Sequence, residues 1–289
     1  MIELLQGSYN INITSNVIWI RGVALAEIGQ IEQAVAGLRE GIEMCERFGA
    51  FYRLDTLYNC LGYCYGEIYQ LEQARKLNIK AEEIARMLME KYPVGRRQWA
   101  HGLGEAVVGL MENLFDQGDH DTAWKRLKSL EEESRSADFD MNRYQWESRL
   151  NLLAAEILLH RNDINAAHAV IEKDLDTVRR QHMKKREGSF LRLLGEIQLR
   201  RNEHEKAVMT LNQAIRILTE VENPRQLWQA HQSLASTLEE LKRLSEARQQ
   251  WGRAAKVIQN SANALSDRGL REGFLKAQPI REILSQTEQ

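Results

Sequence analysis

Proline and cysteine are scarce in this chain of 289 residues, which contains three of each. Few prolines leave long helices uninterrupted. An odd number of cysteines (Cys45, Cys60 and Cys64) favours a reducing compartment over a disulfide framework. The opening MIELLQGSYN does not resemble a signal peptide, and no run of about 18 apolar residues occurs. We therefore expect a cytoplasmic, helical protein with no membrane partner.

The chain also lacks an excess of charge of either sign. Its 39 basic and 41 acidic side chains give a formal net charge of −2, so no overall basic field attracts a phosphate backbone. We therefore expect no nucleic-acid partner. Hydrophobic residues make up 43% of the chain, which is enough to build a continuous core.

Motifs that carry chemistry are missing as well. The sequence contains no phosphate-binding loop of the G-x-x-x-x-G-K-[ST] type and no H-E-x-x-H zinc helix. Cys60 and Cys64 share a helix face at a spacing of four, but two ligands do not make a metal site, and packing thiols are the better interpretation. We expect no catalytic residues, no metal ligands and no cofactor.

What the chain does contain is an internal repeat. A phrase ending in alanine recurs six times, and the successive alanines are separated by 40, 49, 44, 40 and 40 residues. Twelve residues before each alanine stands a residue that is mostly small, which would let two helices approach closely. The alanines are Ala34, Ala74, Ala123, Ala167, Ala207 and Ala247, and the preceding positions are Gly22, Gly62, Met111, Ala155, Gly195 and Ala235.

This pattern predicts an all-α fold, an αα-superhelix of six helix pairs over residues 15–265. Residues 1–14 would end a preceding repeat helix, and residues 266–289 would form a C-terminal capping helix. The turns within the pairs are expected near Gly29, Tyr69, Gly118, Asn162, Asn202 and Lys242. Asn78 and Asp174 stand where the pattern has apolar or small residues, so we expect the weakest joints there.

The segments LLGEIQLRRNEHEKAVMTLNQAI and YNCLGYCYGEIYQLEQARKLNIKA resemble the tetratricopeptide repeat (TPR) family. The period exceeds the family's usual length of about 34 residues. It is similar to that of the long-repeat C-terminal arrays of bacterial signalling ATPases, cyclase-linked ATPases and transcription activators. The resemblance implies a non-catalytic scaffold that binds a protein or peptide, as the sensor or interaction domain of a larger regulator. The alternative is a stand-alone receptor for a small peptide or metabolite.

In the TPR family the first helix of each pair lines a concave groove, so the resemblance also implies which residues face a ligand. Glu112, Glu156 and Glu196 occupy the same position in three successive repeats, and such a row would attract a basic or amphipathic segment. A solvated surface would look similarly charged, and that alternative stays open. The candidate groove residues are Trp19, Asn59, Tyr63, Glu67, Glu112, Asp116, Arg149, Glu156, Arg192, Glu196 and Gln232.

Overall fold

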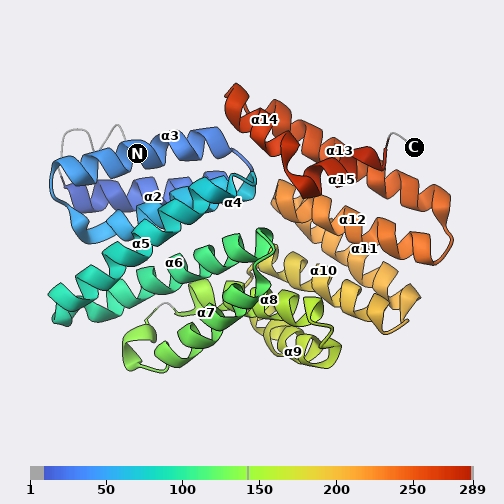
Figure 1. The fold of residues 1–289 in the computed structure, drawn as a ribbon, viewed down its shortest axis with the longest axis horizontal. Helices are drawn as coiled ribbons and strands as arrows, with labels where there is room; N and C mark the ends of the chain where they lie inside the picture. Colours follow the sequence, from blue (N-terminus) through green and yellow to red (C-terminus); the bar gives the residue numbers. More distant parts are fainter. Residues whose placement is uncertain (1–9, 142, 288–289) are drawn as a thin grey trace. The chain divides into compact units, whose positions relative to one another are not determined.

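The computed structural model describes residues 10–141 and 143–287, and these contain fourteen α-helices, three short 3-10 helices and no strand (Figure 1). The expected end of a preceding repeat helix falls largely on residues 1–9, outside the described part, and the first described helix begins at Ile11. The chain divides into two compact units, residues 1–147 and 148–289, which are described separately.

The first unit holds three helix pairs. Within each pair the two helices contact each other, and a 3-10 turn precedes the first helix of the following pair. The elements are α2 (Ile11–Glu27), α3 (Ile31–Arg47), η1 (Phe51–Arg53), α4 (Leu54–Glu67), α5 (Leu71–Lys91), η2 (Pro93–Gly95), α6 (Arg96–Asp116), α7 (His120–Glu133) and η3 (Ala137–Phe139).

The second unit continues the same arrangement. It begins within α8 and ends in two short helices that contact α13. The elements are α8 (Arg143–His160), α9 (Ile164–Arg180), α10 (Lys184–Arg200), α11 (His204–Val221), α12 (Pro224–Glu240), α13 (Leu244–Asn263), α14 (Arg268–Lys276) and α15 (Gln278–Ser285).

All six predicted turns lie at residues with left-handed backbone conformation. Their φ angles run from 55° at Tyr69 to 85° at Gly118. In each turn, the amide of the following residue donates to the carbonyl five positions earlier, as Gln30 N does to Leu25 O at 2.8 Å. This bond satisfies a carbonyl that the helix end would otherwise leave unpaired. In each of the six turns a left-handed residue therefore ends the first helix of the pair. Glycine occupies this position in only two of them, at Gly29 and Gly118.

Small residues bring the paired helices together where the sequence predicted. A Cβ added to Gly22 would lie 2.7 Å from Leu38 Cδ2, and one added to Gly195 would lie 2.5 Å from Leu211 Cγ. Both glycines therefore allow a leucine of the second helix to pack directly on the backbone of the first. The six repeat alanines are all buried between the helices.

Asn78 occupies the position of these leucines in the second repeat, and it is fully buried. Its side chain accepts a hydrogen bond from Asn59 Nδ2 at 3.0 Å and donates one to Asn113 Oδ1 at 2.8 Å. We call Asn59, Asn78 and Asn113 the asparagine ladder, and it joins α4, α5 and α6. Asp174 likewise accepts a hydrogen bond from Asn151. Because these polar groups are bonded, the reason for expecting weak joints at Asn78 and Asp174 no longer holds.

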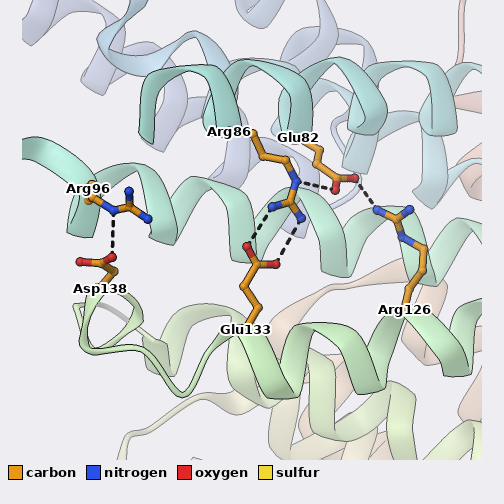
Figure 2. A network of polar contacts seen from close by, with 6 residues as sticks. All are labelled: Glu82, Arg86, Arg96, Arg126, Glu133 and Asp138. Carbon is orange, nitrogen blue, oxygen red and sulfur yellow. Dashed lines mark hydrogen bonds and ion pairs between the residues drawn. The ribbon is translucent and has the colours of Figure 1, made fainter. Parts of the chain in front are cut away.

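Ion pairs on the surface connect the second helices of successive pairs (Figure 2). Arg86 of α5 makes two bonds to the Glu133 carboxylate of α7, at 2.8 and 3.2 Å, and one to Glu82 at 3.0 Å. Arg126 of α7 also bonds Glu82. Among the described residues, no helix is long and apolar enough to cross a bilayer.

Candidate ligand-binding face of the first helices

In each unit the first helices of successive pairs are neighbours. Helix α4 contacts both α2 and α6, and α10 contacts α12. The candidate residues on these helices are therefore grouped within each unit, on what we call the α2–α4–α6 face and the α10–α12 face. The predicted succession of helix pairs is therefore enough to place the candidate residues of neighbouring first helices on a common face.

An arginine covers Trp19, the first aromatic candidate. The Arg53 guanidinium carbon lies 5.0 Å from the Trp19 ring centroid, and it lies at the same distance from the ring of Tyr52. Arg53 Nε also donates to Asn16 Oδ1 at 2.6 Å. Cation–π contacts of this kind hold a guanidinium in place. Repeat reasoning missed Arg53 because it lies in the η1 turn, outside the repeated helices.

Carboxylates end the three first helices of this unit. Glu27, Glu67 and Asp116 are the last residues of α2, α4 and α6, and all three are half-buried. The Tyr63 hydroxyl donates to Glu27 at 3.0 Å and so ties α4 to α2. The C-terminal end of a helix carries partial negative charge, so a carboxylate there is electrostatically unfavourable unless a cation approaches. Glu112, one turn before Asp116, is half-buried on the same helix.

Asn59 does not lie on the exposed part of this face. It is buried, and besides its bond to Asn78 it donates to the backbone carbonyl of Glu105 at 3.1 Å. Its side chain belongs to the joint between α4 and α6. Arg149, in the second unit, is buried as well. The resemblance predicted ligand contact for both, and that contact stays a prediction for two side chains that are buried in this structure.

In the second unit, the predicted carboxylates Glu156 of α8 and Glu196 of α10 share an internal counter-ion. Arg192 is buried and bonds both Glu156 and Glu196, the latter at 2.7 Å. Burial would lower the pKa of Arg192, but the carboxylates of Glu196 and Glu156 outweigh it and hold that pKa above its usual value. Ser233 also donates to Glu196 at 2.6 Å. The repulsion expected between Glu156 and Glu196 is therefore compensated within the protein.

Gln232 is half-buried on α12, next to Ser233 in sequence. Glu156, Arg192 and Glu196 were each predicted as groove residues. Their pairing was not predicted, because repeat alignment gives the helix position and not the direction of a long side chain.

Two buried ionisable groups lie between α4 and α6. Asp55 packs against Gly102, where an added Cβ would meet its Oδ2 at 1.9 Å, and its Oδ1 has no hydrogen-bond partner. Burial raises the pKa of Asp55 to about 7. Burial also lowers the pKa of His101, whose Nδ1 has no hydrogen-bond partner. Neither group could be predicted from the repeat, since both positions vary between repeats.

The three cysteines are buried and free. Burial raises the pKa of the Cys45 thiol to about 11, which disfavours the reactive thiolate. Within the described part of the chain, no three His, Cys, Asp or Glu side chains come together in a way that could hold a metal ion.

Neither the protein-family models nor the curated protein sequences contain a match to this chain. Solved structures do match. BtubC (BKLC) from P. vanneervenii is 16% identical, with 82% of this chain and 94% of that chain covered and a TM-score of 0.52. A Rap protein complexed with Competence and Sporulation Factor is 15% identical, with 100% and 80% covered and a TM-score of 0.60. Cut9 with Hcn1, from the APC/C hetero-tetramer, is 12% identical, with 100% and 58% covered and a TM-score of 0.53. These likenesses show the fold class, an all-α TPR-like solenoid.

Proposed function

We propose that the chain is a non-catalytic scaffold that binds a protein or peptide on the faces of its first helices. The fold supports this, because a solenoid of stacked helix pairs presents extended helix faces to a ligand. Two of the similar structures hold partners, a Rap protein with Competence and Sporulation Factor and Cut9 with Hcn1. The resemblance to signalling arrays adds a role as the C-terminal sensor or interaction domain of a larger signalling ATPase or regulator.

The observation that carries the proposal is the row of helix-end carboxylates on the α2–α4–α6 face. Glu27, Glu67 and Asp116 lie at the C-terminal ends of their helices, where a cationic ligand would meet the negative charge of the carboxylates together with that of the helix dipoles. The expected partner is therefore a basic or amphipathic segment that contacts the first unit.

Site-specific crosslinking tests where the partner lies. A photoreactive amino acid replaces Val23 on α2 or Gln232 on α12, with Gln73 on the exposed surface of α5 as the matched control. The full chain then captures proteins from the lysate of its source cells. Crosslinking of one partner from a first-helix position and not from Gln73 is expected. Crosslinking from Gln73 alone would place the partner on the second helices and contradict the proposal.

A groove beside α2 and α3 favours a second candidate, a stand-alone receptor for a small peptide or metabolite. Its volume is about 440 Å³, within the range of small-molecule sites. Apolar side chains such as Ile18, Leu25 and Met44 line it together with Arg21 and Glu40. Native mass spectrometry of the purified chain separates the two candidates. A small molecule bound at one per chain, lost when Gly37→Trp fills the groove, supports the receptor.

A further inference from the structure

Two neighbouring connections of the first unit expose large apolar side chains. The connection between α3 and α4 exposes Phe48 and Phe51, 53% and 43% accessible, and the connection between α5 and α6 exposes Tyr92 and Val94, 45% and 105% accessible. Both connections lie at the same end of their antiparallel helices (Figure 1). We call Phe48, Phe51, Tyr92 and Val94 the apolar edge.

An aromatic contact holds the two connections side by side. Tyr52 of η1 meets Trp99, in the first turn of α6, edge to face with ring centroids 5.9 Å apart. Gly95 of η2 packs on the same tryptophan, because a Cβ added there would lie 2.9 Å from Trp99 Nε1. The buried Trp99 ring therefore contacts residues of both connections that carry the apolar edge.

Cations accompany the apolar side chains. Residues 47–53 and 91–97 contain five lysines or arginines and no aspartate or glutamate, and one of the five, Arg96, is paired with Asp138 at 3.0 Å (Figure 2). Arg47 lies over the ring of Phe48 at 5.5 Å, and Lys91 over that of Tyr92 at 5.4 Å. Glu46, beside Arg47, is bonded to Tyr58 and Lys80. The apolar edge thus combines exposed aromatic and aliphatic side chains with neighbouring positively charged side chains.

The fold does not require this feature. In the second unit, the connections after α9, α11 and α13 contain no exposed large apolar side chain within the described residues, and the exposed Met209 and Leu244 lie in helices. The apolar edge is therefore a local property of the first unit, and an exposed apolar patch of this kind indicates a binding surface.

We propose that the apolar edge is a peripheral binding surface for a membrane that contains anionic lipid. To bury a fully exposed valine at the tip of a turn, a protein partner would have to provide a pocket of matching shape. The headgroup region of a bilayer can accept protruding side chains of any shape. Aromatic and aliphatic residues bury in the acyl boundary while lysine and arginine contact anionic headgroups. Peripheral binding requires no spanning segment, so the lack of a long apolar run in the sequence does not oppose it.

Flotation with lipid vesicles tests the proposal on the full chain. Vesicles of phosphatidylcholine with about one third phosphatidylserine should carry the protein upward, and pure phosphatidylcholine should not. Lys91→Gln with Arg97→Gln should weaken binding by about fivefold for each cation removed. Val94→Asp should abolish it, and since Val94 makes no buried contact the variant should keep the helical circular dichroism spectrum.

Matched controls are Met209→Asp and Arg248→Gln in the second unit, which change exposed residues of the same kinds and should leave flotation unchanged. Three results would overturn the proposal: no flotation with anionic vesicles, equal flotation with neutral vesicles, or flotation that Val94→Asp leaves intact. If the protein does not float with vesicles but crosslinks to an acidic protein from position 94, the apolar edge is a protein interface instead.

Discussion

At the scale of single residues, polar side chains at core positions of the repeat are matched by partners from neighbouring helices. The asparagine ladder and the Glu156–Arg192–Glu196 triad both follow this rule. Buried polar groups that find partners cost little, whereas orphaned ones cost the full desolvation penalty. Asp55 and His101 of the first unit do not follow it, because Asp55 Oδ1 and His101 Nδ1 have no hydrogen-bond partner.

Asp55 should make the first unit less stable as the pH rises. Its folded pKa of about 7 lies above the ordinary 3.8, so its contribution to the free energy of unfolding is full below pH 3.8 and falls until about pH 7. Arg53 opposes the shift without cancelling it. Asp55→Asn should therefore raise the free energy of unfolding at pH 8 by roughly 2 to 4 kcal/mol relative to pH 4. Hydrogen exchange of α4 and α6 amides at both pH values measures this.

Comparing the variant with the unchanged protein at each pH cancels the effect of His101, whose lowered pKa destabilises the fold as the pH falls below 6.5. An Asp55→Asn difference that is the same at pH 4 and pH 8 would show that Asp55 does not titrate in this range.

Asn78→Leu should destabilise the joint between α4 and α6. Leucine fits the site by analogy with Leu38 on Gly22, but the change removes the donor to Asn113 Oδ1 in a buried position. The expected loss is about 1 to 3 kcal/mol in the free energy of unfolding. Urea titration followed by tryptophan fluorescence measures it. A higher free energy of unfolding for the variant would mean that the hydrogen bonds of the asparagine ladder do not stabilise the joint.

At the scale of elements, the repeat predicted the helices and turns because both depend on short-range patterns. All six turns fall on left-handed residues at the predicted positions, and the six alanines are buried. The side-chain pairing across repeats was not predictable, because the direction of Arg192 or Asn78 depends on a helix about 35 residues away in the repeat. The Arg53 contact with Trp19 was missed because Arg53 lies in the η1 turn, outside the repeated helices.

Arg86→Gln should change stability little. Arg86, Glu82, Arg126 and Glu133 join α5 to α7, yet Arg86 and Glu133 are substantially exposed, and exposed ion pairs contribute about 0 to 1 kcal/mol. We expect a loss below about 1 kcal/mol that disappears in high salt. Urea titration at low and high salt tests this. A loss that persists in high salt would assign Arg86 a packing role.

At the scale of the whole molecule, neighbouring helix pairs pack on one another within each unit, and α14 and α15 cover the last pair. Phe274, Ile280 and Ile283 of these helices are buried, and both helices contact α13. Removing the chain from Leu270 onward should expose the apolar face of α13 and cause aggregation. Light scattering during size-exclusion chromatography detects it. Removing only residues 286–289 is the control, and a monomeric Leu270 truncation would show that the two helices do not act as a cap.

The most direct test of the central claim, that the first-helix face binds a basic partner, is the affinity of a charge-neutral variant. Glu67→Gln, Glu112→Gln and Asp116→Asn are combined, with Glu43→Gln, Glu83→Gln and Glu90→Gln on the exposed second helices as the matched control. Calorimetry with the captured partner is run at low and high salt. The account predicts weaker binding and a shallower salt dependence for the first variant alone. Equal affinity and equal salt dependence for both variants would contradict it.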